Sequence, residues 1–357
     1  SNRSPGMQNK AHKGRGALSA LPGRFATTTI EADEPPPERA PETTLRATRA
    51  GRIIARNQSP DIPFDQSINP YLGCEHGCVY CYARPSHSYL DLSPGLDFET
   101  QIFYKHNAVS QLLDTWSKPG YRCEPIAIGA NTDPYQPAEK EFEITRGLLE
   151  AFLAHRHPVT LITKGSLMSR DLDLLEALAA LNLVSVAISI PTATSALKRI
   201  MEPRVPAAAA RFRLMADLAA AGVPVSVLVA PVIPAVNDAE IESILECAAE
   251  NGAQYAGWIL LRLPHELKQI FRDWLAEHFP DRARHVMSLI RQASGGQDYD
   301  NRFGVRQRGR GPYADMIRDR FRNACRRFGL GDGGTRKALD CGRFRPPGQQ
   351  QMTLAFD

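Results

Sequence analysis

Residues 69–82 read NPYLGCEHGCVYCY, and they place three cysteines, Cys74, Cys78 and Cys81, within eight positions. Three thiolates with this spacing can hold one face of a cubane iron–sulfur cluster, which proteins bind through cysteine sulfur. Gly73 and Gly77 allow the tight turns that such a loop needs. No fourth cysteine lies nearby in the sequence, so one iron of a [4Fe–4S] cluster would keep an open coordination site.

Structural zinc, with His76 as a fourth ligand, is the alternative to a cluster. Zinc sites usually pair two Cys-x₂₋₄-Cys knuckles, or one knuckle with a distant pair of histidines. The sequence has no second cysteine cluster, and His76 lies inside the loop, where it cannot complete a tetrahedron with its neighbours. We therefore favour a [4Fe–4S] cluster whose open iron is chelated by the amino and carboxylate groups of S-adenosylmethionine (SAM).

The composition indicates a globular protein in a reducing compartment. Hydrophobic residues make up 43% of the 357 positions, which is enough for one large core. The seven cysteines are an odd number, and three of them crowd together, a pattern that favours a metal site over a disulfide framework. No apolar run reaches the length of a bilayer span, and no signal peptide opens the chain. We expect a cytoplasmic protein without a membrane partner.

Short apolar runs alternate with helical spacing along the middle of the chain. A short strand is expected before Cys74, and five more are expected at 125–130, 159–163, 184–190, 223–229 and 257–261. Helical periodicity marks the segments between them, at 141–155, 169–181, 207–221 and 238–251. Repeated βα units form a parallel sheet. Six units are too few for a closed eight-stranded barrel, so we expect an α/β fold with a partial (β/α)₆ barrel and a helical C-terminal extension.

The same pattern predicts four regions along the chain. Residues 1–60 are rich in proline and basic residues without apolar periodicity, which indicates either a mobile arm or a wrap around the domain. We place the barrel with its cluster loop at 61–263, an arginine-rich helical extension at 264–330 and a flexible tail at 331–357.

The amino-acid sequence around the cysteines resembles that of the radical SAM superfamily, and within it that of a family related to spore photoproduct lyase. The matching segments are 69–81, 83–85, 131–137, 163–164, 202–204, 230–234, 261–264 and 308–314, within a similarity that spans about residues 55 to 330. The resemblance implies a reduced cluster, an external electron donor of the flavodoxin or ferredoxin type, and cleavage of SAM to a 5′-deoxyadenosyl radical. It does not determine the substrate.

The resemblance also implies residues that bind SAM at the carboxyl ends of the strands. Lys164 matches a lysine that pairs with the SAM carboxylate, and Ser189 matches a ribose contact. The segment that contacts the amino group corresponds to Asn131, Thr132 and Asp133, although the Gly-Gly-Glu text of the superfamily is absent there. Glu202 and Arg204 complete the polar site or, alternatively, form a surface ion pair.

Two tyrosines flank the third cysteine. Tyr80 is expected against the cluster and adenine, or simply in the core. Tyr80 and Tyr82 match the positions that resemble a hydrogen-atom relay in spore photoproduct lyase, which has a separate cysteine donor. That cysteine does not transfer, because Ala130 stands beside the Asn-Thr-Asp segment, and Cys123 precedes its strand and belongs at the wrong end of the barrel.

Nine arginines lie between 302 and 330, with aromatic residues among them and only two acids. Such a mixture fits a groove that follows a phosphate backbone and stacks on bases, and the alternative is a solvated helix face whose aromatics lie in the core. We expect contacts to DNA phosphates from this region, with Arg306, Arg308, Arg310 and Arg318 as the candidate residues.

The chain ends with a second candidate binding element. Gln351, Leu354 and Phe356 resemble the short peptide with which bacterial repair enzymes dock on the DNA sliding clamp. The sequence as a whole therefore predicts a radical SAM enzyme that repairs DNA lesions. Two alternatives remain open: a radical SAM enzyme that modifies RNA, protein or a small metabolite, and a non-catalytic iron–sulfur adaptor in a DNA-repair complex.

Overall fold

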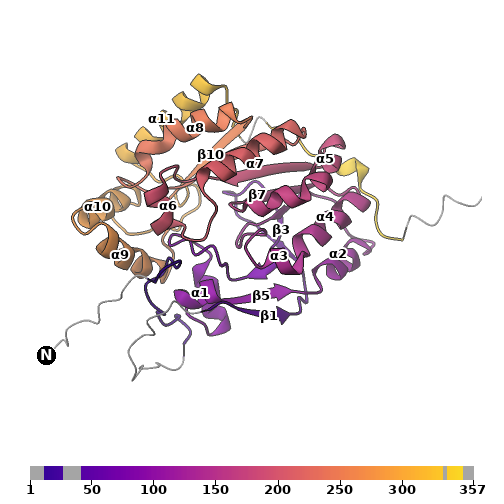
Figure 1. Ribbon diagram of the computed structural model, residues 1–357, viewed down its shortest axis with the longest axis horizontal. Coiled ribbons are helices and arrows are strands. Elements are labelled where there is room, and N and C mark those ends of the chain that lie inside the picture. Colours follow the sequence, from indigo (N-terminus) through magenta and orange to yellow (C-terminus); the bar gives the residue numbers. More distant parts are fainter. Residues whose placement is uncertain (1–11, 27–41, 333–335, 349–357) are drawn as a thin grey trace, which may run out of the picture.

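The computed structural model describes residues 12–26, 42–332 and 336–348, and it contains the expected partial barrel (Figure 1). Six parallel strands run in the order β10-β9-β8-β7-β6-β3, and β2 (Ile54–Arg56) adds an antiparallel strand at the edge beside β3. The parallel strands are β3 (Gln66–Ile68), β6 (Ile126–Ile128), β7 (Val159–Thr163), β8 (Val184–Ser189), β9 (Val225–Val232) and β10 (Tyr255–Leu260). The predicted fold class is confirmed.

Helices cover the outside of the sheet, because parallel strands bury both of their faces. Every residue of β8 is buried, and the alternate residues of β7 that face the core are Val159, Leu161 and Thr163. The covering helices are α2 (Ala108–Trp116), α3 (Glu139–Phe142), α4 (Ile144–Ala154), α5 (Leu172–Ala180), α7 (Ala208–Ala220) and α8 (Ile241–Glu250). The helix α6 (Ser195–Met201) packs in a second apolar cluster, apart from the one that holds the strands. The predicted helices and strands are all present, with ends shifted by a few residues.

The largest local difference from the predicted strands is at β6, which spans three residues instead of six. Gly129 ends it with a φ of +91°, and its N–H donates to Ile68 O at 3.4 Å. A β-carbon at this position would lie 2.2 Å from Ile162 O, so the turn needs glycine. The early turn brings residues 131–133 toward the cysteine loop.

The region that precedes the barrel contributes structure that the sequence pattern did not reveal. β1 (Thr44–Thr48) pairs with β5 (Gln101–Lys105), which also pairs with β4 (Tyr71–Leu72) in a separate three-stranded sheet. β1 is mostly exposed, so it carries no apolar alternation that could have announced a strand. Residues 12–26 lie against the cysteine loop and the short helix α1 (Leu96–Thr100), where Leu96 N donates to Ser19 O.

The C-terminal extension consists of α9 (Leu267–His278), α10 (Ala283–Ala293) and α11 (Pro312–Phe328), and Figure 1 shows α11 alongside α8. Residues 336–348 continue past the amino ends of the strands, where the Arg336 guanidinium donates to the Ser185 and Ser226 hydroxyls. The candidate clamp-binding residues Gln351, Leu354 and Phe356 lie outside the described residues. Within the described ranges, no helix has both the length and the apolar character to span a bilayer.

Candidate active site

The cysteine loop lies across the carboxyl ends of the barrel strands. It leaves β4 at Gly73 and ends at the 3-10 helix η1 (Arg84–Leu90), and Val79 N donates to Met201 O, beyond β8. Gly73 and Gly77 have φ values of +79° and +67°, so both turns use conformations that other residues rarely adopt. The path of the loop therefore depends on the two glycines that the sequence pattern singled out.

A buried ion pair fixes the back of this loop. The Arg84 guanidinium donates to Cys78 O through both Nε and Nη2, at 3.0 and 2.8 Å, and pairs with Glu99 Oε1 at 2.5 Å. Glu99 also accepts from Gly16 N and Ala17 N, at 3.1 and 2.8 Å. Both charged side chains are fully buried. The pair thus joins the backbone of a cysteine ligand to the N-terminal segment.

The three cysteines fit an iron–sulfur cluster and do not fit a single zinc ion. Cys74 and Cys78 are buried, Cys81 is partly buried, and all three are free thiols. In the part of the chain that the structure describes, no three His, Cys, Asp or Glu side chains converge on a point that could hold one ion. A cluster does not need that convergence, because each thiolate binds a different iron. His76 Nδ1 instead lies 3.3 Å from Asp133 Oδ2.

Burial raises the pKa of all three thiols above that of a free cysteine. Thiolate ligation therefore has to be coupled to metal binding, as in other metal sites built from buried cysteines. When bound, the reduced cluster supplies the electron that cleaves SAM to methionine and a 5′-deoxyadenosyl radical.

Lys164 follows β7 and points into the space beside the loop. Its ammonium lies 5.8 Å from the centre of the Tyr80 ring, and among the described residues it has no hydrogen-bonding partner. Burial acts to lower the pKa of Lys164, but the charges of Cys78, Glu202 and Asp133 outweigh it and raise the pKa. A partly buried cation without a hydrogen-bonding partner fits the carboxylate of SAM. The contact of Lys164 with SAM stays a prediction.

Glu202 lies in a buried network rather than in a surface ion pair with Arg204. Tyr80 donates its hydroxyl to Glu202 Oε1, and Arg211 Nη2 donates to Glu202 Oε2 at 2.8 Å. Arg211 Nη1 also donates to the backbone oxygen of Ser189 at 2.7 Å. The alternative prediction that Glu202 and Arg204 form a surface ion pair is therefore wrong. The charge of Glu202 is balanced from α7, and Glu202 in turn orients the Tyr80 ring.

Arg204 and Ser189 also have protein partners. Arg204 pairs with Glu75 in the cysteine loop at 3.1 Å, outside the Tyr80 network. The Ser189 hydroxyl donates to Ala230 O at 3.1 Å and is buried. The roles of both residues toward SAM stay predictions.

The segment 131–133 connects the loop to β7. The Asp133 carboxylate accepts from the Thr163 hydroxyl at 2.6 Å and from Lys164 N at 2.7 Å. Burial acts to raise the pKa of Asp133, but His76 and these donors lower it to about 2. The Thr132 hydroxyl donates to Tyr71 O. Thr132 is buried and Asp133 is partly buried, whereas Asn131 is exposed. Asp133 thus holds strand ends together, and the contact to the SAM amino group stays a prediction.

Tyr82 is 40% exposed at the mouth of the barrel, and its hydroxyl donates to Ala130 O. The Arg262 guanidinium, which follows β10, lies 4.8 Å from the centre of its ring. The tyrosine therefore stands beside Ala130, the position at which the resemblance would have required a cysteine donor. Cys123 lies elsewhere, where burial and the neighbouring Cys341 thiol raise its pKa.

Intramolecular contacts hold most of the predicted DNA-binding arginines. Arg306 Nε donates to Asp61 at 2.6 Å, and the Arg308 guanidinium lies over the Trp258 ring at 4.8 Å. Arg318 pairs with Asp315 at 2.7 Å, and Arg310 lies 4.0 Å from Asp300. Spacing along the chain does not reveal the partner of Arg306, because Asp61 lies 245 residues away in sequence. DNA contact from these four residues stays a prediction.

The sequence reasoning missed three residues that organise the site: Arg84, Glu99 and Arg211. Arg211 carried a detectable signal, since it takes a core position of α7 in register with Leu214, Met215 and Leu218. A cation on an apolar helix face needs a buried acid as its partner. Glu99 gave no such signal, because its backbone partners lie more than 80 residues away.

Comparison with known proteins defines the class to which this barrel and loop belong. The radical SAM superfamily model matches residues 68–248, and the chain belongs to that superfamily. It is therefore a SAM-dependent radical enzyme, with a [4Fe–4S] cluster and SAM as its cofactors.

Individual relatives and solved structures are also similar to this chain. An uncharacterised Mycobacterium tuberculosis protein is 37% identical over 243 residues, covering 67% of this chain and 72% of the relative. A protein of Methanocaldococcus jannaschii is 26% identical and covers 60% of this chain and 76% of its own. A cysteine-to-serine mutant of spore photoproduct lyase superposes with a TM-score of 0.60 over 87% of this chain and 88% of the lyase. The identity is 14%, so this likeness establishes the fold alone.

Proposed function

We propose that this radical SAM enzyme acts on lesions in DNA, with Tyr82 as the residue that passes a hydrogen atom between the substrate and the adenosyl group derived from SAM. The observation that carries the proposal is the position of Tyr82: a tyrosine directly after the third cysteine, 40% exposed at the barrel mouth, with its hydroxyl at Ala130 O. The fold is that of spore photoproduct lyase, which has been solved in complex with a dinucleoside spore photoproduct (TM-score 0.59, 14% identity, 81% of each chain).

The neighbourhood of Tyr82 supports an anionic substrate. The Arg262 guanidinium lies over its ring. Burial raises the pKa of the Tyr82 hydroxyl, and the positive charges of Arg262, Lys164 and Arg306 act against this rise. Cations around a half-exposed phenol favour a substrate with negative charge. Because Ala130 replaces the cysteine donor, the lesion chemistry differs from that of the spore photoproduct in how the hydrogen atom is returned.

The test is formation of 5′-deoxyadenosine by the anaerobically reconstituted, dithionite-reduced protein, with UV-irradiated or unirradiated DNA. Irradiated DNA should stimulate formation and lose its lesions. The Tyr82→Phe variant should still load the cluster and should retain the slow cleavage of SAM that is not coupled to a substrate. It should no longer remove lesions from DNA. The matched control is Tyr89→Phe, a tyrosine that is 72% exposed and whose ring contacts Phe25. Equal product with both DNAs would contradict the proposal.

A further inference from the structure

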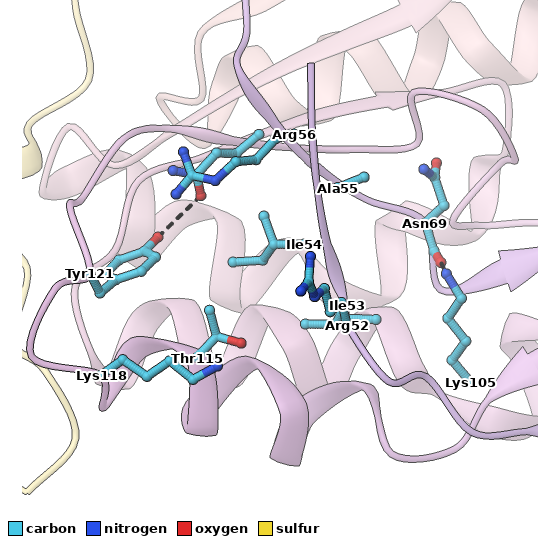
Figure 2. Close-up of a pocket in the computed structure, with 11 residues that line it drawn as sticks. Arg52, Ile53, Ile54, Ala55, Arg56, Asn69, Lys105, Thr115, Lys118 and Tyr121 are labelled. Carbon is cyan, nitrogen blue, oxygen red and sulfur yellow. Dashed lines mark hydrogen bonds between the residues drawn. The ribbon is translucent and has the colours of Figure 1, made fainter. Parts of the chain in front are cut away.

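A basic groove runs along the edge of the barrel, beside the edge strand β2. The hollow has a volume of about 530 Å³. Strand β2 with Arg52 and Ile53 before it forms one wall, and the end of α2 with Lys118 and Tyr121 forms the other (Figure 2). Lys105, from the end of β5, and Asn69, which follows β3, close the groove on the side of the barrel mouth.

The charged side chains that line this groove are all basic. Arg52, Arg56, Lys105 and Lys118 line it, and no acidic side chain does. In the described part of the chain none of these four cations forms an ion pair, although most arginines of the C-terminal extension do. Figure 2 shows Arg56 and Lys118 toward one end of the hollow, Lys105 at the other and Arg52 between them. Unneutralised cations around a hollow attract an anion more strongly than paired ones on a helix face.

The side chains are available for binding. Arg52, Arg56 and Lys118 are exposed, and only Lys105 is partly buried, with its ammonium donating to Asn69 O at 2.7 Å. Burial lowers the pKa of Lys105, an effect that an anion in the groove would oppose.

The groove leads to the candidate active site. Asn69 Oδ1 accepts from Asn131 N at 2.9 Å, and the neighbouring residue, Ala130, accepts the Tyr82 hydroxyl. β2 has three residues and spans about 10 Å, and three nucleotides of one B-form strand rise by about the same distance. A bound strand could thus place its phosphates along the groove and continue to the mouth.

From these observations we propose that the groove between β2 and α2 binds the phosphate backbone of the DNA strand that carries the substrate nucleotide. This inference rests on the proposed function and adds to it the surface that holds the strand. It assigns affinity, not base recognition, to the four cations, since contacts to phosphate position a strand without reading its sequence.

The test uses the full-length, cluster-loaded protein and a fluorescein-labelled, undamaged 20-nucleotide single-stranded DNA, followed by fluorescence anisotropy between 0.05 and 0.3 M salt. The triple variant Arg52→Gln, Arg56→Gln, Lys118→Gln removes three exposed cations. It should bind about 100-fold more weakly near 0.1 M salt, and its log–log salt slope should be smaller by about 2, since each phosphate contact contributes about 0.7 on a single strand.

The matched control removes the same net charge from three other exposed arginines, on α6, α7 and α10: Arg199→Gln, Arg213→Gln, Arg284→Gln. It should keep the affinity of the unchanged protein within about threefold, because long-range charge effects are screened at this salt concentration. Circular dichroism and iron content should be the same for both variants.

The proposal is overturned if the triple variant keeps its affinity and slope, if the control loses as much, or if the unchanged protein does not bind DNA. An RNA of the same sequence that binds at least tenfold more tightly would also overturn the assignment to DNA. The proposed function fails separately: the groove stands if DNA binds through it but irradiated DNA does not stimulate 5′-deoxyadenosine formation. Conversely, irradiated DNA can stimulate 5′-deoxyadenosine formation while the triple variant binds DNA as tightly as the unchanged protein. That result would exclude the groove as the DNA-binding surface and would leave the proposed function standing.

Discussion

Removing the charge of Glu99 should destabilise the whole cysteine loop. Glu99 and Arg84 are both fully buried and 2.5 Å apart, and Glu99 also accepts from Gly16 N and Ala17 N. The Glu99→Gln change leaves the Arg84 guanidinium buried without its anion, and the new amide N–H faces a backbone donor. Breaking a buried pair from one side costs about 3–5 kcal/mol. A domain has only about 5–15 kcal/mol in total, so a large fraction of the stability should be lost.

Urea denaturation under anaerobic conditions measures this loss, and iron analysis after reconstitution measures its effect on the cluster. Iron content should fall, because Arg84 also holds the carbonyl of the ligand Cys78. The control is Asp315→Asn, which breaks an exposed pair with Arg318 and should cost no more than about 0.5 kcal/mol. A Glu99→Gln protein that loses less than about 1 kcal/mol and binds full iron would refute the reasoning.

Three further predictions concern the cluster, SAM and pH. Replacing Cys74, Cys78 and Cys81 together by alanine should remove the brown colour and the approximately four irons per chain expected after reconstitution, and stoichiometric zinc without iron uptake would contradict the cluster. Lys164→Ala should weaken SAM binding by about 1.5–3 kcal/mol in equilibrium dialysis, whereas an unchanged affinity would place the carboxylate partner elsewhere. Burial lowers the pKa of His157 to about 4, so its contribution to stability is complete above about pH 6.5 and is lost as the pH falls toward 4. Thermal unfolding across this range should show a loss of up to about 3 kcal/mol that His157→Gln reduces, and parallel curves for the two proteins would count against it.

The barrel was predictable because its signals are local. Each of β7, β8 and β9 is an apolar run of five to eight residues, and each helix between them repeats its apolar positions within a few turns. β1 and β2 were not predictable in the same way. They are short and mostly exposed, so their pairing depends on β5 and β3 rather than on their own side chains.

The sequence by itself predicted the three cluster ligands and determined the end of the barrel at which these cysteines lie. Cys74, Cys78 and Cys81 are adjacent in the chain, and a loop after a parallel strand has to emerge at its carboxyl end. Lys164 follows from the same rule, because it is the first residue after β7.

Only the tertiary structure decided how the charges are shared. Residues that look like free cations in sequence have acids brought to them from far away: Glu242 lies 78 residues from its partner Arg320, and Asp61 lies 245 residues from Arg306. Conversely, Arg52, Arg56, Lys105 and Lys118 are scattered over 67 positions and meet around one hollow without an acid. Pairing depends on distances of a few ångströms that the fold sets and that spacing along the chain does not encode.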